Sequence, residues 1–243
     1  MDHGTRGELI GRLAEAIRSA RTTHPLRVAV DGPPAAGKTT LADEVADVLR
    51  AQGRDVIRAT VDDFLVPRAQ RYRRGRYSAE GCYFDAHDRA ALCRVLLDPL
   101  GPGGDRRFRC AVYDKDADTP LLPPAATAAA DAVLLFDGVF LLRPELVDRW
   151  DLRILVSVPF ARTLERARER AATPPGATAD TADTAGTAGA TAIERSWRHR
   201  YIPSQQLYFA VARPADRADV IVYNDQLQRP AWEVRPHPPI QGT

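Results

Sequence analysis

One short stretch constrains the fold of this chain more than any other. It reads Gly32-Pro-Pro-Ala-Ala-Gly37-Lys38-Thr39 and fits the pattern G-x-x-x-x-G-K-[ST]. An apolar run, Leu26 to Val30, precedes it, and a segment with helical periodicity, Thr39 to Leu49, follows it. A short apolar run that ends in a Gly/Pro turn is typical of a buried strand. The stretch therefore predicts a strand, a tight turn and a helix in direct succession.

The turn between this strand and helix has the composition of an anion-binding cradle, the P-loop. Its glycines let the backbone aim successive N–H groups inward, beside the positive end of the helix dipole. In this pattern Lys38 reaches the β and γ phosphates of a nucleotide, and the Thr39 hydroxyl ligates Mg²⁺. The alternative is a plain glycine turn with a capping threonine and a surface lysine. We expect a nucleoside triphosphate, ATP first, to bind at Gly32, Pro33, Pro34, Ala35, Ala36, Gly37, Lys38, Thr39 and Thr40.

Lysine is rare in this chain, which makes each lysine informative. Of 34 Lys and Arg residues, only Lys38 and Lys115 are lysines, and acids bring the net charge to +2. Lys115 stands between Asp114 and Asp116, which favours a solvated ion pair; the alternative is that it approaches a bound acceptor. The near-neutral charge gives no reason to expect a nucleic acid partner.

The composition also excludes several classes of protein. The three cysteines are widely spaced and form no CxxC pair, which argues against a disulfide framework and against structural zinc. No run of 18 apolar residues occurs, so we expect no membrane partner. The charged first thirty residues do not resemble a signal peptide. We expect a cytoplasmic protein.

Apolar runs and helical periodicity alternate along the rest of the chain. Together with the first strand they predict a three-layer α/β/α fold with a mostly parallel sheet, and a binding crevice at the carboxyl ends of its strands. We expect one P-loop domain over residues 1–243, with its core at about 24–225. The predicted strands are 56–61, 108–113, 132–136, 152–158 and 219–223, and the predicted helices are 7–21, 87–97, 160–171 and 193–211.

Two segments differ from this core in composition. Residues 173–192 consist almost wholly of Thr, Ala, Gly, Asp and Pro, and we interpret them as a low-complexity insertion in a helical lid. Residues 228–243 are rich in proline, and we expect a tail that runs along the surface.

Two acidic positions follow predicted strands. Asp62 comes at the end of the strand 56–61, and Asp137 directly follows the apolar run 132–136. At the carboxyl end of a parallel sheet such acids can hold Mg²⁺ or accept a proton from a hydroxyl. Each can also be an ordinary turn residue. The guanine-reading NKxD motif of GTPases and the LSGGQ signature of ABC ATPases are missing, which leaves a small-molecule kinase.

Several stretches, taken in order, resemble the uridine kinase branch of the uridine kinase and phosphoribulokinase family. They span about residues 28 to 225. These stretches are Val30-Asp31-Gly32 through Thr40, Val61-Asp62-Asp63-Phe64, Gly81 through Asp88, Phe136-Asp137-Gly138 through Leu141, Arg200-Tyr201-Ile202-Pro203 through Tyr208, and Ala218-Asp219-Val220-Ile221-Val222.

The resemblance implies a role for individual residues. Asp62 corresponds to the general base beside the acceptor hydroxyl, and Asp137 to the acid near Mg²⁺. Asp85 corresponds to a ligand of ribose hydroxyls, and Tyr113 to a neighbour of the base. Lid arginines close on the phosphates in this family, and the best matches are Arg166, Arg170 and Arg198.

The resemblance implies ATP-dependent phosphorylation of a nucleoside 5′-hydroxyl, with uridine and cytidine as first substrates. Two alternatives stay open: a kinase of pantothenate, a sugar phosphate or a modified nucleoside, and a non-catalytic nucleotide-binding module. The arginine-rich stretch Arg68 to Arg76 adds a further question. It can be a solvated loop or a nucleic acid contact, or it can edge the acceptor pocket, in which case the acceptor itself can carry a phosphate.

Overall fold

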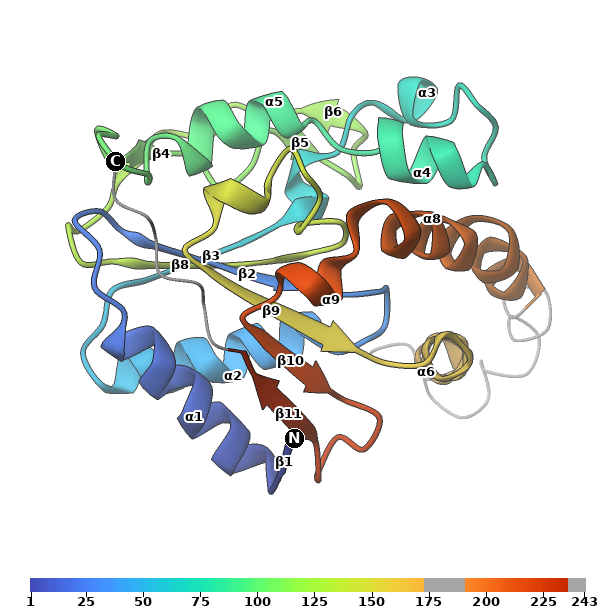
Figure 1. Ribbon diagram of the computed structural model, residues 1–243. Helices are drawn as coiled ribbons and strands as arrows, with labels where there is room; N and C mark the ends of the chain where they lie inside the picture. Colours follow the sequence, from blue (N-terminus) through green and yellow to red (C-terminus); the bar gives the residue numbers. More distant parts are fainter. Residues whose placement is uncertain (173–190, 236–243) are drawn as a thin grey trace.

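A seven-stranded sheet forms the centre of the molecule (Figure 1). The computed structural model describes residues 1–172 and 191–235. The strand order is β1-β11-β10-β9-β2-β8-β3. The five strands from β10 to β3 are mutually parallel, and β11 runs antiparallel to β10 and β1. The strands are β1 (Asp2–His3), β2 (Leu26–Asp31), β3 (Val56–Thr60), β8 (Val133–Gly138), β9 (Leu152–Ser157), β10 (Val220–Tyr223) and β11 (Ala231–Val234).

Helices cover both faces of this sheet. Figure 1 shows α1 (Arg6–Ser19) and α2 (Lys38–Ala51) on one face, and α4 (Ala79–Asp85), α5 (Arg89–Leu92) and α8 (Ile202–Ala212) on the other. Helix α6 (Phe160–Ala172) follows β9. Shorter elements are η1 (Val61–Phe64), α3 (Arg68–Arg71), η2 (Cys93–Leu97), η3 (Val147–Arg149), η5 (Trp197–Tyr201) and α9 (Pro214–Arg217). Four two-residue strands form two small separate sheets: β4 (Arg107–Phe108) with β7 (Ala126–Thr127), and β5 (Tyr113–Asp114) with β6 (Thr119–Pro120).

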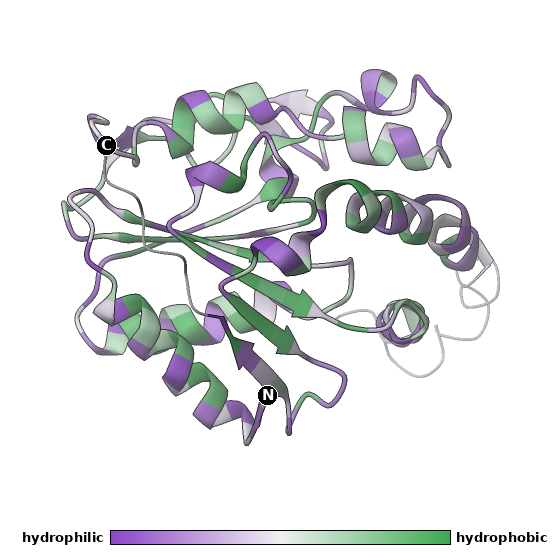
Figure 2. Cartoon of the chain, in the orientation of Figure 1, coloured by the Kyte–Doolittle hydropathy of each residue, from purple (hydrophilic) through white to green (hydrophobic). Residues whose placement is uncertain are grey.

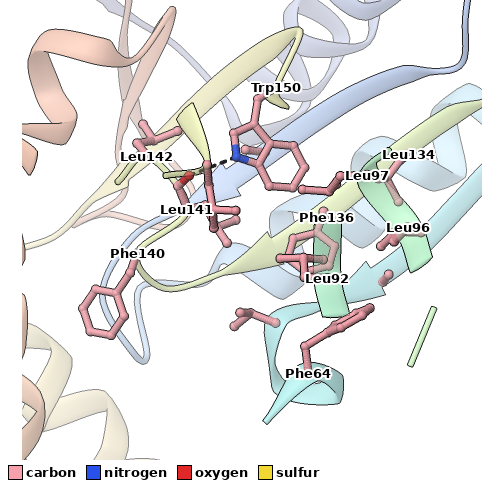
Figure 3. Packing of buried hydrophobic residues seen from close by; sticks show 14 of the residues in the cluster. Phe64, Leu92, Leu96, Leu97, Leu134, Phe136, Phe140, Leu141, Leu142 and Trp150 are labelled. Carbon is pink, nitrogen blue, oxygen red and sulfur yellow. Dashed lines mark hydrogen bonds between the residues drawn. The ribbon is translucent and has the colours of Figure 1, made fainter. Parts of the chain in front are cut away.

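Two apolar cores lie on the two faces of the sheet. Side chains of α1 and α2, such as Leu13 and Leu41, pack on one face of the central strands. On the other face, Trp150 packs on Phe136 and donates its indole N–H to the carbonyl of Leu141 at 2.9 Å (Figure 3). Figure 2 shows β9 and β10 as mostly hydrophobic, and every residue of β2 and β8 is buried, as expected for a sheet that is covered on both faces.

The predicted three-layer α/β/α fold with a mostly parallel sheet is confirmed. The predicted strand 108–113 is wrong, because Phe108 and Tyr113 belong to the two small sheets. Part of the predicted tail is a strand, because β11 pairs with β10 and buries Trp232. The ordered core is also wider than 24–225, because α1 packs on α2. None of the described helices has the length and apolarity to cross a membrane.

Most of the proposed insertion 173–192 and the end of the tail, residues 236–243, lie outside the described residues.

Candidate active site

The turn between β2 and α2 has the backbone that its glycines predict. Gly32 has a φ of +151°, and a Cβ built on it would lie 2.3 Å from the carbonyl oxygen of Val156 on β9. Gly37 has a φ of +90° and stands at the N-cap of α2. A side chain at Gly32 has no space, because the obstacle is backbone rather than a movable side chain. The turn therefore lies directly against the neighbouring strand.

This contact leads to a prediction about stability. We expect Gly32→Ala to lower the free energy of unfolding by about 1–3 kcal/mol, because the new Cβ needs both a strained φ and a shift of β9. Urea denaturation followed by circular dichroism measures the change. Gly11→Ala is the matched control, because Gly11 lies inside α1 with no atom within 4 Å of its built Cβ. This control should raise stability by about 0.5–1 kcal/mol. A Gly32→Ala protein as stable as wild type contradicts the close approach.

Lys38 lies inside the turn and is 8% exposed. Its ammonium group donates to the carbonyl oxygen of Pro33 at 2.9 Å. Burial lowers the pKa of Lys38, while the carboxylates of Asp31, Asp137 and Asp62 oppose this shift. These acids favour the charged form of the lysine. A compact positive charge is thus held in the centre of the turn.

Two oxygen groups meet beside the turn. The Thr39 hydroxyl at the start of α2 donates to Oδ2 of Asp137 on β8 at 2.6 Å. Oδ1 of Asp137 accepts from the Arg58 guanidinium on β3 at 2.8 Å. Arg58 also pairs with Asp43 at 2.9 Å, which fixes the guanidinium from a second side. The sequence pattern did not indicate that an arginine orients Asp137.

These oxygen groups fit a magnesium ion. Mg²⁺ prefers hard oxygen ligands and is usually bound through one or two protein groups together with substrate phosphates. Thr39 and Asp137 supply a hydroxyl and a carboxylate at one point. No cluster of three or more His, Cys, Asp or Glu side chains with metal-binding geometry occurs among residues 1–172 and 191–235. A magnesium ion held by Thr39 and Asp137 would take its other ligands from phosphate oxygens and water.

Buried polar contacts hold the turn from behind. Asp31 at the end of β2 is fully buried, accepts from the Tyr208 hydroxyl and accepts from the Leu141 amide at 3.2 Å. Burial raises the pKa of this carboxyl, against the effect of the Tyr208 hydrogen bond and the Lys38 charge. The hydroxyl of Tyr208 also accepts from the Leu142 amide. Helix α8 is thus tied to the strand that leads into the turn.

A second set of contacts fixes the far side of the turn. The Asn224 side chain donates to the carbonyl oxygen of Ala36 at 2.7 Å, and Arg166 donates to the carbonyl oxygen of Asn224 at 2.6 Å. Arg166 also reaches the carbonyl oxygens of Ala36 and Asp225. Arg166, which the resemblance implies as a catalytic lid arginine, is therefore buried against backbone carbonyls and supports the turn from α6.

A cleft of about 670 Å³ opens at the carboxyl ends of the strands. Lys38, Thr39 and Asp137 form one side of it, and Asp62 of η1 and Arg170 of α6 face the same space. The structure thus brings together five of the residues that the sequence singled out. Its other lining side chains include Arg71, Tyr72, Cys82, His87, Lys115, Trp197, Arg200, Tyr201 and Gln205.

A second hollow of about 370 Å³ lies on the other side of the turn. Gly37, Thr40, Arg166 and Asn224 line it, and Ala35 and Arg170 line both this hollow and the cleft. The glycine turn thus borders two neighbouring spaces, and Arg170 lines both.

Three residues named from the resemblance do not line the cleft. Asp85 pairs with Arg74 at 2.6 Å, and Asp85 and Tyr113 both line a third hollow of about 630 Å³. The Tyr113 hydroxyl donates to Asp118 at 2.6 Å. Arg198 is exposed and pairs with Glu194 at 2.8 Å. In this structure Asp85, Tyr113 and Arg198 are thus separated from Lys38 and Asp62.

Two other arginines line the cleft. Arg200 of the π-helix η5 (Trp197–Tyr201), rather than Arg198, lies in the cleft wall. Arg200 shares one helix face with the other cleft-lining residues Trp197, Tyr201, Ser204 and Gln205, and Arg198 lies off that face. Arg71 of the arginine-rich stretch also lines the cleft.

His87 and Cys82 are neutral groups in the cleft. Burial, with smaller effects from Arg143 and other guanidinium groups, lowers the pKa of His87 far below its ordinary value. Burial raises the pKa of the Cys82 thiol. Neither group therefore offsets the charges of the lysine and arginine side chains around it.

Comparisons with known proteins place these features in a family. A family model described as the cytidylate kinase-like family matches residues 27–226. A possible uridine kinase from Bacillus stearothermophilus is 23% identical with a TM-score of 0.66, over 88% of this chain and 97% of that one. D-glycerate 3-kinase from Cryptococcus neoformans is 16% identical with a TM-score of 0.59, over 95% and 97%. These two likenesses show the fold. No curated protein matches the chain.

Proposed function

We propose that this chain, which belongs to the cytidylate kinase-like family, transfers the γ-phosphoryl group of ATP to a hydroxyl group of a small molecule. The family is one of P-loop small-molecule kinases, and the similar solved structures include a possible uridine kinase and a D-glycerate 3-kinase. The observation that carries the proposal is the position of Asp62. This carboxylate lies in the same cleft as Lys38 and Arg170.

The proposed reaction uses the two spaces on either side of the P-loop. The triphosphate binds along the turn, and the nucleoside of the donor extends into the hollow beyond Gly37. The acceptor binds in the larger cleft, where Asp62 takes the proton of the attacking hydroxyl as a general base. Lys38 and Arg170 neutralise charge on the transferred group, which is the main work of the protein in phosphoryl transfer. Thr39 and Asp137 would hold Mg²⁺, which would neutralise charge at the phosphates.

Uridine and cytidine remain the first nucleosides to test, as the resemblance implies. Asp85 and Tyr113, the proposed ribose and base contacts, line the neighbouring hollow rather than the cleft. A nucleoside acceptor therefore needs either a movement of α4 or other contacts. The wider proposal, a hydroxyl acceptor of any kind, does not depend on these two residues.

An ADP-release assay tests the proposal. The acceptors are uridine, cytidine, pantothenate, glycerate, ribose and ribose 5-phosphate, each with ATP and MgCl₂. We expect at least one to stimulate ADP release above the rate with ATP alone. ATP binding without stimulation by any acceptor contradicts the kinase assignment and favours a regulatory nucleotide-binding module.

A further inference from the structure

The cleft has more positive charge than phosphate transfer needs. Its lining contains five cationic side chains and two carboxylates. Of the carboxylates, Asp137 is already paired with Arg58. Lys38 and Arg170 lie at the P-loop, where the triphosphate binds. Three further cationic side chains line the cleft: Lys115, Arg200 and Arg71, of which Arg71 also reaches Asp118 at 3.4 Å.

Arg71 and Arg200 lie close to each other. Both guanidinium groups approach the Tyr72 ring, with their carbons 5.6 Å and 4.9 Å from its centroid. They come from α3 and η5, which both pack against α4. The nearby Tyr201 is close enough to both Arg200 and Asp62 for each to affect its pKa. The pair is therefore in the part of the cleft next to the proposed base.

Arg200 lacks a carboxylate partner within the described part of the chain. It is 5% exposed, and its guanidinium donates to the carbonyl oxygens of Arg76 and Ser78. No acidic side chain of residues 1–172 or 191–235 lies within 4 Å of it. A buried charge without a partner is costly unless another group supplies the opposite charge. A bound anion is such a group.

Lys115 also faces the cleft without an ion pair among the described residues. The neighbouring carboxylate of Asp114 instead accepts from the backbone amides of Asp116 and Ala117. The expected solvated pair with Asp114 is thus replaced by a turn, and Lys115 lines the cleft near Asp63. The structure favours the alternative in which this lysine approaches the acceptor.

Unpartnered polar atoms in the same cleft point to a ligand independently of charge. Gln205 of α8 is 1% exposed, and both polar atoms of its amide are buried without a hydrogen bond. Nε of Arg71 and Nε1 of Trp197 are also buried without a partner. All three side chains line the cleft. Buried polar atoms are nearly always paired in folded proteins, so several exceptions at one cleft indicate groups that a ligand satisfies.

We propose that the acceptor of this kinase is an organic anion, a hydroxylated phosphate monoester or carboxylate. Its charged group binds between Arg71, Arg200 and Lys115, and a neutral polar group of the same molecule pairs with the Gln205 amide. This inference rests on the proposed function, because it places the acceptor beside Asp62. The reactive hydroxyl points toward Asp62, and the anion binds at the other end of the molecule.

The first test is a binding measurement that needs no turnover. The P-loop is filled with a non-hydrolysable ATP analogue and MgCl₂, and thermal unfolding is followed with ribose 5-phosphate, glycerate or cytidine 3′-monophosphate. The neutral counterparts are ribose, glycerol and cytidine. We expect at least one anion to raise Tm by several degrees where its counterpart does not. Equal shifts within every pair, or no shift with any probe, overturn the inference even if the enzyme is an active kinase.

Variants locate the binding site. We expect Arg71→Gln and Lys115→Gln each to raise the KM or Kd of the bound anion at least tenfold. Arg73→Gln is the matched control, because Arg73 is exposed in the same stretch and lines the third hollow instead. This control should leave anion affinity within twofold of wild type. Equal losses in Arg73→Gln and Arg71→Gln contradict a specific site.

Gln205→Met separates ligand binding from stability. Removing a buried, unpaired amide should keep or raise Tm, because no hydrogen bond of the folded protein is lost. The same change should raise the KM for the acceptor at least fivefold. Unchanged KM shows that the amide does not meet the acceptor. The ADP-release assay distinguishes the two proposals. Stimulation by neutral acceptors alone contradicts the anionic acceptor but still supports the kinase function.

Discussion

Asp62→Asn is expected to lower kcat by about 100- to 10,000-fold and to leave the affinity for ATP unchanged. The carboxylate accepts the proton of the attacking hydroxyl, and this contribution is typical of a positioned general base. An asparagine has nearly the same shape but cannot take up the proton. Steady-state kinetics with the best acceptor measure kcat, and titration calorimetry measures ATP binding.

The neighbouring carboxylate provides the control. Asp63 follows directly in η1, but it does not line the cleft, and burial raises its pKa. We expect Asp63→Asn to stay within a few-fold of wild-type kcat. If Asp62→Asn retains the wild-type rate, or if both variants lose the same activity, Asp62 does not act as the base.

Lys38→Ala is expected to lower kcat by about 100- to 1,000-fold and to weaken ATP binding, because a positioned positive charge facing the transferred phosphoryl is lost. Lys38→Arg is the sharper variant. The space inside the turn holds an 8% exposed ammonium that donates to Pro33. A planar guanidinium is larger and has a fixed fork of donors, so we expect a loss close to that of Lys38→Ala.

The two Lys38 variants are compared by kinetics and calorimetry, with thermal unfolding to confirm that each protein is folded. Arginine is the usual cationic side chain of this chain, because only two of its 34 Lys and Arg residues are lysines. A Lys38→Arg protein with wild-type kcat contradicts the view that only a compact ammonium fits the turn.

The central fold could be predicted because its signals are local. The apolar run before Gly32 and the periodicity of 39–49 produced β2 and α2 within one or two residues of the expected bounds. The strand β11 could not be predicted in the same way. Ala231 and Trp232 form a short strand only because the edge of β10 is open to them, which is a property of the folded sheet.

A place in the cleft could be predicted for residues at the carboxyl end of a strand or in the P-loop, as for Asp62, Asp137 and Lys38. The lid arginines could be predicted only in part. Arg170 lines the cleft as expected, but the resemblance pointed to Arg198, whereas Arg200 lies with Trp197 and Tyr201 on the helix face that lines the cleft. Arg166 lies on the expected helix, but it contacts the P-loop turn from the side away from the cleft. Nothing in the sequence pointed to Gln205. Only the structure shows that its buried amide has no hydrogen-bond partner.

The identity of the phosphorylated product tests the account most directly. The enzyme is incubated with ATP, MgCl₂ and the acceptor that best stimulates ADP release, and the products are followed by phosphorus NMR and mass spectrometry. The account predicts one new phosphate monoester for each ADP formed, on a hydroxyl of the acceptor. Formation of inorganic phosphate alone, with the acceptor recovered unchanged, contradicts it.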